Sequence, residues 1–306
     1  MIGVKPASIS APAKVNLYLH VGPVRSDGRH PLDSLVVFAD ARAADRLHFA
    51  PSDEALRLNV SGPGMDDAML GADEDNLVLR AARLLSQKMG VTFKGILTLE
   101  KHLPIAAGIG GGSSDAAATL RLLNHVFELG LSVEELMTMS VPLGGDVPAC
   151  VAGEPVLMRG DGDCIEALRT LPPEFPAVLV TLPIACPTGP VFRAFDELDD
   201  APPFSECEPP AGSGGQAYLA SLRSGYRNDL QAPAIARHPE IGDLLERLQA
   251  VTGARFVAMS GSGATCFALF ADEQAARHAA SVIRDQSPTF WVAETKLGAA
   301  GFDLLV

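Results

Sequence analysis

A run of glycines followed by two serines is the stretch of this sequence best suited to binding a charged ligand. The run lies in LPIAAGIGGGSSDAAATL, residues 103–120, and consists of Gly108, Gly110, Gly111, Gly112, Ser113 and Ser114. Glycine adopts backbone angles that other residues avoid and lets a ligand approach the main chain closely. If Ser113, Ser114 and Asp115 cap a helix, its first amide N–H groups and the positive end of its dipole favour an anion. The run therefore predicts a polyphosphate-binding loop.

The surroundings of the run distinguish such a loop from a flexible linker. A strand-like segment, 96–100, precedes it and an alanine-rich helix follows, the strand–loop–helix order of phosphate loops. A Walker A loop requires Gly-Lys-Ser/Thr, yet no lysine stands between Lys101 and the helix. A dinucleotide fingerprint requires glycine where Ser113 stands. We therefore expect a nucleotide loop of a third kind, with Lys101 available to contact phosphate.

A second group of polar residues lies on an early strand. From Val15 the segment 8–21 alternates apolar and polar residues, so Lys14 and Asn16 should share one face with His20. The opposite face should carry the apolar residues Leu17, Leu19 and Val21. A single lysine on a strand is usually a solvated surface charge, so Lys14 alone does not indicate a site.

Three turns could present further functional groups. Asp146 lies between a glycine pair and Pro148. Its side chain either forms an ordinary Asx-type turn, or the rigid turn fixes the direction of its carboxylate for a function. The turn at 26–28 presents Arg29 and His30, as a solvent-facing hairpin tip or as a substrate-facing loop. The glycine–serine turn at 260–263 either closes on a phosphate or substrate or is a simple hairpin turn.

Composition narrows the class of protein. The chain has 306 residues, 47% of them hydrophobic, so it can bury a large core in two domains or one large α/β unit. A formal net charge of −13 argues against a nucleic-acid or anionic-membrane surface. The five cysteines form no CxxC pair, and neither a signal peptide nor an apolar run of about 18 residues is present. We expect a cytoplasmic protein with reduced thiols.

The periodicity predicts an α+β fold in two lobes, residues 1–170 and 171–306. Strands are expected at 8–21, 35–38, 46–50 and 56–60, all in one sheet, and at 92–99. A helix at 76–89 should be capped by Asp73 or Asp75, and a helix at 133–140 by Ser132. Later elements are a hairpin at 155–168, a strand at 177–182, helices at 188–198, 228–237, 240–252 and 273–284, and a strand at 290–296. Residues 199–216, rich in Pro, Gly and Ser, predict an exposed, mobile loop.

Three stretches in chain order resemble the signature motifs of the GHMP kinase superfamily of small-molecule kinases. They are PAKVNLYLHV, LPIAAGIGGGSSDAAATL and AMSGSGATCFALF, and the match spans residues 12–270. DGRHPLDSLVVF, DNLVLRAARLL and GGDVP further resemble the family of kinases that act on 4-diphosphocytidyl-2-C-methyl-D-erythritol in the non-mevalonate isoprenoid pathway. The resemblance implies the GHMP kinase fold, with a ribosomal protein S5-like N-terminal lobe and a ferredoxin-like C-terminal lobe.

The resemblance also implies a role for each matched residue. Asp146 would accept the proton of the substrate's 2-hydroxyl, while Lys14 would orient this hydroxyl and stabilise the developing negative charge. The residues implied for ATP are Asn76, Leu77, Lys101, Pro104, Gly108, Gly110, Gly111, Gly112, Ser113 and Ser114. The residues implied for the substrate are Asn16, Arg29, His30, Asp146, Thr188 and Phe192.

Within the substrate site, Asn16 and Thr188 would contact the sugar-alcohol end. His30 would bind the cytosine edge and Phe192 would stack on the ring. The family usually has tyrosine where Arg29 stands, and that tyrosine stacks on the cytosine; an arginine could stack there as a guanidinium plane or turn to the diphosphate.

ATP and Mg2+ are the implied cofactors, because phosphoryl transfer needs a cation on the phosphate oxygens. The sequence identifies no metal ligand. The expected partners are ATP and a cytidine diphosphate sugar alcohol, with neither nucleic acid nor membrane, in a monomer or homodimer. Other readings are a homoserine or mevalonate kinase, a superfamily decarboxylase, or a catalytically silent nucleotide-binding protein.

Overall fold

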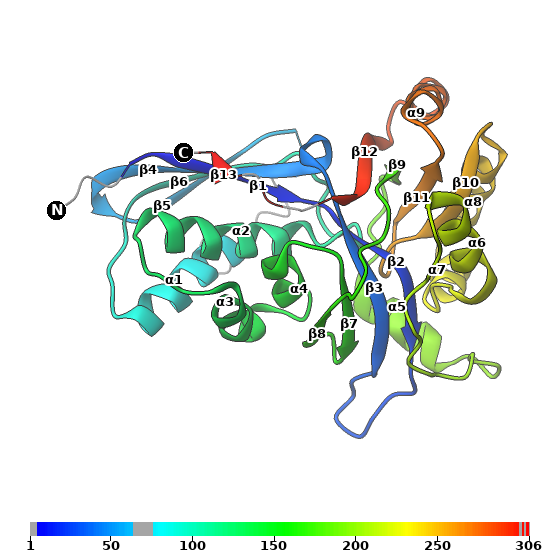
Figure 1. Cartoon of the computed structure of the whole chain (residues 1–306), viewed down its shortest axis with the longest axis horizontal. Helices are drawn as coiled ribbons and strands as arrows, with labels where there is room; N and C mark the ends of the chain where they lie inside the picture. The colour runs from blue at the N-terminus through cyan, green and yellow to red at the C-terminus, as the bar shows by residue number, and fades with distance from the viewer. Residues whose placement is uncertain (1–4, 64–75, 300–301, 303, 306) are drawn as a thin grey trace.

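The computed structural model describes residues 5–63, 76–299, 302 and 304–305, and it has two sheets and two groups of helices (Figure 1). Asp73 and Asp75, the expected helix caps, lie outside the described residues. Among the described residues, no helix is long and apolar enough to cross a lipid bilayer. The α+β prediction is confirmed.

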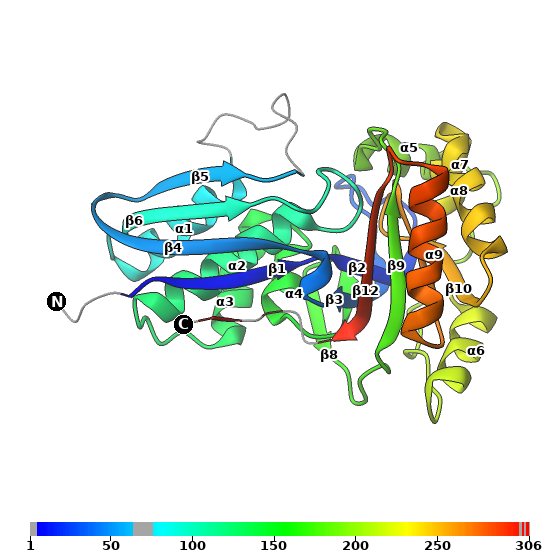
Figure 2. The ribbon, with the colours of Figure 1, turned by 90° about the horizontal axis from the view of Figure 1, so that it is seen from above.

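The first sheet and its helices form one layered unit. Its strand order is β13-β1-β4-β6-β5. The strands are β1 (Ala7–Pro12), β4 (Ala44–Ala55), β5 (Arg57–Ser61), β6 (Lys94–Glu100) and β13 (Leu304–Leu305). The helices are α1 (Leu77–Met89), α2 (Gly111–Val126), α3 (Val133–Ser140) and α4 (Val147–Ala152). All four helices lie on the same side of the sheet, and a continuous apolar core separates the two layers (Figures 1 and 2).

The second sheet extends from the centre of the molecule to its far side. Its order is β10-β11-β9-β12-β3-β7-β8, with β2 paired to β3. The strands are β2 (Lys14–Val21), β3 (Leu32–Ala39), β7 (Val156–Gly160), β8 (Cys164–Ala167), β9 (Phe175–Thr181), β10 (Ala254–Met259), β11 (Thr265–Phe270) and β12 (Trp291–Ala299). The helices beside it are α5 (Thr188–Asp196), α6 (Gly215–Gly225), α7 (Gln231–Arg237), α8 (Pro239–Ala250) and α9 (Glu273–Gln286) (Figure 2).

The segment 8–21 is two strands in two sheets, which corrects the expectation of one sheet. The break is at Ala13, whose amide donates to Ala43 and whose carbonyl accepts from Ala39, outside either ladder. β1 therefore stays with β4 and β5, whereas β2 pairs with β3. Because one chain segment joins both sheets, residues of β2 lie at the junction of the two units.

A β-bulge in β2 corrects the predicted faces of that strand. The register against β3 shifts between Asn16 and Tyr18. One extra residue reverses the alternation of side chains beyond it. Leu19 therefore faces the same cavity as Lys14 and Asn16, while His20 packs against Tyr18 on the opposite side. The expectation that His20 shares the face of Lys14 was wrong for this reason.

Two other local expectations need correction. The helix α1 is capped by Asn76, whose side chain accepts from the Val78 amide. The Pro/Gly/Ser-rich segment has no helix or strand at 201–212, but it is exposed only in part, because Pro210 is buried and Cys207 half-buried. Its end, from Gly215, forms α6, because a short amphipathic pattern in GQAYLASLRSG buries Tyr218, Leu219 and Leu222.

Ser132 caps α3, as expected, and does so in a capping box with Glu135. Ser132 accepts from the Glu135 amide at 3.2 Å, and the Glu135 carboxylate accepts from the Ser132 amide at 2.8 Å. The hairpin of β7 and β8, the buried strand β9 and the helices α5, α7, α8 and α9 also lie where the sequence predicts them, to within a few residues. The boundary near residue 170 stays a prediction.

Candidate active site

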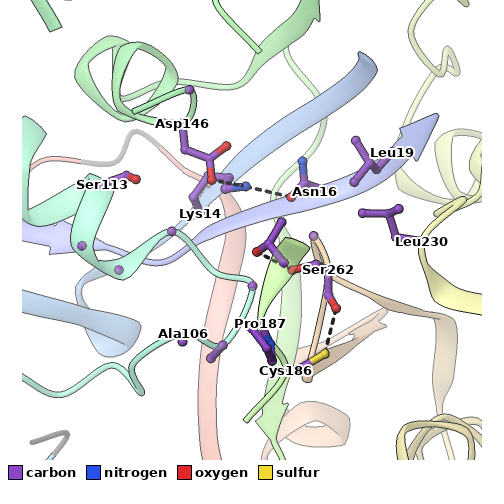
Figure 3. A pocket seen from close by; sticks show the side chains of 18 of the residues that line it. Lys14, Asn16, Leu19, Ala106, Ser113, Asp146, Cys186, Pro187, Leu230 and Ser262 are labelled. Atoms are coloured by element: carbon purple, nitrogen blue, oxygen red, sulfur yellow. Dashed lines mark hydrogen bonds and ion pairs between the residues drawn. The ribbon is translucent and has the colours of Figure 1, made fainter. Parts of the chain in front are cut away.

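A cavity of about 490 Å³ lies where the two units meet (Figure 3). One wall comes from β2, from Leu77 at the start of α1, and from Gly145 and Asp146 before α4. A second wall is the glycine-rich loop at 106–113, and a third comes from Cys186–Thr188, Phe192, Leu230 and the turn at 261–262. Residues that are up to about 250 positions apart in sequence therefore surround one space.

The glycine-rich loop leads into helix α2, whose first residues line this cavity. Gly108 and Gly110 have φ values of +75° and +62°, which favour glycine. α2 begins at Gly111, and the first intrahelical bond runs from the Ser114 amide to Gly110 at 2.8 Å. The amides of residues 111–113 thus lack intrahelical partners where Gly111, Gly112 and Ser113 line the cavity. Such a helix start can hold an anion.

The expectation that Ser113, Ser114 or Asp115 caps α2 is wrong. Gly110 is the N-cap residue, and no side chain caps the helix. Ser114 and Asp115 lie inside the first turns, where the Ser114 hydroxyl donates to Pro12 at 2.7 Å. The side chain of Ser114 is fully buried and does not line the cavity, so only Ser113 of the two serines offers its hydroxyl there.

The turn between β10 and β11, with the first residue of β11, supports the glycine-rich loop through hydrogen bonds. The Ser260 hydroxyl donates to the Gly108 carbonyl at 3.0 Å, and the Thr265 hydroxyl donates to the Ala107 carbonyl at 2.6 Å. A methyl group on Gly108 would come within 2.6 Å of the Ser260 carbonyl oxygen. The two readings of this turn are therefore compatible: it joins two strands, and its Gly261 and Ser262 line the cavity.

Sequence reasoning missed the residue that holds this turn. The Asn228 amide group donates to the carbonyls of Met259 and Gly261, both at 2.8 Å. Its neighbour Asp229 accepts from the Val21 amide at 2.9 Å, so this pair ties the turn to β2. The adjacent Asn228 and Asp229, just before α7, were the available signal.

Lys14 and Asp146 meet at the cavity wall, as expected. The Lys14 ammonium lies 3.1 Å from the Asp146 carboxylate and donates to Asn16 at 2.9 Å (Figure 3). Lys14 is almost fully buried, whereas the Asp146 side chain is 34% exposed and opens to the cavity. The Asn16 amide group in turn donates to Ser34 at 2.8 Å, which fixes its orientation.

Lys101 is not among the residues that line the cavity. Its ammonium contacts Asp45 and lies 2.8 Å from Asp115, and all three residues are buried. Burial alone would lower the pKa of Lys101, but the two carboxylates outweigh it and raise it. Because this charge is already balanced inside the protein, we no longer expect Lys101 to bind phosphate.

A second cavity, of about 830 Å³, adjoins the first and shares Leu32, Gly145 and Phe192 with it. His30 and Phe192 meet there, with ring centroids 5.0 Å apart. His30 also lies 2.9 Å from the Gly22 carbonyl, through Nδ1, and 3.4 Å from Asp196, through Nε2.

Arg29 lies at the rim of the second cavity. It is two-thirds exposed and pairs with Asp161 at 3.2 Å. Arg25 contacts the same carboxylate. The guanidinium of Arg29 is therefore directed towards Asp161 rather than Phe192 in this structure.

Of the other predicted site residues, some line the first cavity and others do not. Thr188 lines the first cavity and contacts the Ser262 hydroxyl at 2.9 Å, and Leu77 lines the opposite wall. Asn76 and Pro104 are not among the lining residues. The role of Asn76 that the structure shows is to cap α1.

Comparison with known proteins agrees with this geometry. A family model of the GHMP kinases N terminal domain matches residues 76–154, which include the glycine-rich loop and Asp146. A model of the GHMP kinases C terminal region matches residues 217–288.

Two relatives are 4-diphosphocytidyl-2-C-methyl-D-erythritol kinases. The one from Hyphomonas neptunium is 49% identical over 292 residues, covering 95% of this chain and 96% of the relative. The one from Paramagnetospirillum magneticum is 44% identical over 291 residues, covering 95% and 98%.

Solved structures extend the comparison. A crystal structure of a 4-(cytidine 5'-diphospho)-2C-methyl-D-erythritol kinase has a TM-score of 0.76 at 32% identity and covers 95% of this chain and 99% of its own. A homoserine kinase from Cytophaga hutchinsonii has a TM-score of 0.71 at 16% identity, over 100% and 98%, which shows the fold alone. The chain belongs to the GHMP kinases, and among them to the family of its 4-diphosphocytidyl-2-C-methyl-D-erythritol kinase relatives.

Proposed function

We propose that this chain transfers the γ-phosphate of ATP to the 2-hydroxyl of 4-diphosphocytidyl-2-C-methyl-D-erythritol, a step of the non-mevalonate isoprenoid pathway. Relatives of that name at 44–49% identity support the substrate. The observation that carries the chemistry is the Lys14–Asp146 pair, 3.1 Å apart, in the cavity that the start of α2 enters. A silent nucleotide-binding protein would not need this pair.

Asp146 and Lys14 divide the work on the substrate hydroxyl. One Asp146 oxygen pairs with Lys14, so the other can accept the hydroxyl proton from the cavity side. Phosphoryl transfer has a loose transition state whose charge spreads over the phosphate oxygens. A fixed ammonium and free helix amides stabilise such charge without reorganising. Asn16 holds Lys14 in place through the bond at 2.9 Å.

The residues around the helix start fit ATP with Mg2+. The three residues whose amides lack intrahelical partners, Gly111, Gly112 and Ser113, line the same cavity as Asp146. The Ser113 hydroxyl is a hard oxygen donor, the type that Mg2+ prefers, and it would complete a coordination supplied mainly by phosphates. The bound ion would neutralise charge on those phosphates. Asp115 is excluded from this role because it is buried and does not line the cavity.

The rest of the substrate would lie along the two joined cavities. Asn16 and Thr188 line the first, where we place the sugar alcohol, and Phe192 spans both. We place the cytosine against Phe192, with His30 exchanging its Asp196 contact for the base edge. Arg29 would have to leave Asp161 to reach the base or the diphosphate.

The test is ATP consumption by the purified chain with Mg2+, with product masses identified. 4-Diphosphocytidyl-2-C-methyl-D-erythritol, homoserine and mevalonate are offered in parallel. Phosphorylation of the cytidine compound alone supports the proposal. Turnover of homoserine or mevalonate instead would overturn the substrate and keep the chemistry, release of carbon dioxide would indicate a decarboxylase, and no turnover would indicate a silent binder. Sedimentation of the same sample tests the expectation of a monomer or homodimer.

A further inference from the structure

His20, Asp33 and Cys207 meet on the side of β2 and β3 that faces away from the catalytic cavity. Each offers one ligand atom, and these atoms all lie within 4.8 Å of one another. His20 and Asp33 belong to adjacent paired strands, while Cys207 belongs to the 201–212 loop. No part of the proposed phosphoryl transfer uses this cluster.

One distance within the cluster matches that expected in a tetrahedral metal site. The Cys207 sulfur lies 3.6 Å from His20 Nδ1. With a metal–sulfur bond of about 2.3 Å and a metal–nitrogen bond of about 2.0–2.1 Å, tetrahedral geometry separates the two ligand atoms by about 3.6 Å. A sulfur, an imidazole nitrogen and a carboxylate oxygen form a borderline-soft set, which suits zinc better than magnesium or calcium.

The protein already positions the two buried ligands. Asp33 is fully buried, and its Oδ1 accepts from Arg159 at 2.8 Å. Its Oδ2 accepts from the Tyr18 hydroxyl at 3.2 Å and from the Cys207 amide at 3.0 Å, so the loop is docked against the carboxylate. The contact of Oδ1 with Arg159 is of the outer kind that orients ligands in metal sites.

His20 is buried with few polar partners. The residue is 2% exposed, and within the described part of the chain its Nε2 atom is buried with no hydrogen-bond partner. Its other nitrogen faces the Cys207 sulfur, and a thiol is a weak partner. A metal ion on Nδ1 would give this nitrogen a stronger partner than the thiol, and buried polar groups normally have such partners.

We propose that His20, Asp33 and Cys207 bind one zinc-class divalent transition-metal ion. The half-buried Cys207 gives the ion a route from solvent and leaves a fourth position for water. Binding converts the Cys207 thiol to a thiolate and releases its proton to solvent. The ion would join the 201–212 loop to β2, the strand that carries Lys14.

The experiment titrates Co2+, as a stand-in for zinc, into the full-length chain after removal of metals and reduction with a phosphine. A thiolate ligand gives Co2+ a charge-transfer absorption in the near ultraviolet. Wild type and the Cys164→Ser control, which lacks an exposed thiol outside the cluster, should show this band at one ion per chain, and zinc should abolish it. Cys207→Ser should lose the band, and His20→Phe should weaken binding about tenfold or more.

A second readout does not depend on spectra. Excess zinc should raise the melting temperature of wild type and Cys164→Ser, because a ligand that binds only the folded state stabilises it, and should not raise that of Cys207→Ser. Absence of the band in wild type, its persistence in Cys207→Ser, or equal zinc stabilisation of both would overturn the proposal. Because neither readout needs turnover, failure here leaves the proposed kinase activity untouched.

Discussion

Two buried lysines lie on either side of the glycine-rich loop and have opposite surroundings. A methyl group on Gly110 would lie 3.1 Å from the Lys14 side chain, and one on Gly111 would lie 3.5 Å from the Lys101 ammonium. Lys14 pairs with one carboxylate, Asp146, at the edge of the cavity. Lys101 lies between two buried carboxylates, with no opening to the cavity.

The comparison shows that the neighbouring carboxylates decide whether a buried lysine stabilises the fold or acts on a ligand. Two carboxylates and one ammonium leave Lys101 no charge to offer a ligand, so its ammonium joins β4 and α2 to the segment that follows β6. Lys14 has one carboxylate partner, Asp146, whose side chain is partly exposed. Both charges can therefore act on a molecule in the cavity. Removing one member of a buried ion pair costs stability, whereas removing a group that faces a substrate costs turnover.

The largest expected effect is on turnover in Asp146→Asn. An amide cannot accept the hydroxyl proton, so kcat should fall about 10²- to 10⁴-fold, the usual contribution of a general base. ATP binding, which depends on the helix start, should change little. Rapid-quench turnover and nucleotide titration measure the two effects, and an unchanged kcat would remove Asp146 from the mechanism.

The next effect is on stability, in Lys101→Met. Loss of the ammonium leaves Asp45 and Asp115 buried without their cation, which should lower the free energy of unfolding by about 3–5 kcal/mol. Urea unfolding measures this loss. The exposed Lys88, changed to Met, is the matched control and should lose less than about 0.5 kcal/mol. Equal losses would show that the buried cluster contributes no special stability.

A smaller effect is expected for Gly108→Ala, in the loop between the lysines. The φ of +75° and the 2.6 Å approach to the Ser260 carbonyl should together cost about 2–3 kcal/mol and weaken ATP binding. Gly90→Ala is the control, since Gly90 has a φ of +65° but nothing within 4 Å of the added methyl. If both variants lose the same stability and bind ATP equally well, backbone angle alone explains Gly108.

The effect that is smallest per pH unit is a pH dependence that Asp115→Asn should remove. Burial raises the pKa of Asp115 to about 7, against the opposing pull of Lys101. Between its ordinary value of 3.8 and about 7 the folded state binds a proton that the unfolded state lacks, so this group's contribution to stability falls as pH rises.

Urea unfolding of wild type and Asp115→Asn from pH 4.5 to 8 measures this contribution. The stability of the variant relative to wild type should increase with pH, by at most about 1.4 kcal/mol per unit, and level off above pH 7. A difference that is constant with pH, or that decreases, would contradict the assignment of the proton to Asp115.

The sequence predicted correctly those features that depend on residues close together in the chain. Glycines at 108–112 predict a helix start that binds anions, and Ser132 predicts the cap of the helix that follows it. Both depend on residues within a few positions, so the prediction needs no tertiary knowledge. The pairing of Lys14 with Asp146 came from family resemblance, and the structure agrees with it.

The sequence was uninformative where long-range packing decides. Nothing near Lys101 indicates that Asp45, 56 positions earlier, would neutralise it. The bulge after Asn16 that turns His20 away from the cavity depends on the register against β3. The docking of Cys207 onto Asp33, 174 positions away, contradicts the composition of its loop.

The most direct test compares Lys14→Met with Lys101→Met in one assay of kcat and melting temperature. The account predicts that Lys14→Met melts within a few degrees of wild type and loses kcat by about 10²-fold or more. Lys101→Met should melt far lower but retain near wild-type kcat per folded molecule at low temperature. If Lys101→Met stays stable and loses kcat, while Lys14→Met unfolds and the folded fraction turns over normally, the assignment of the two lysines is wrong.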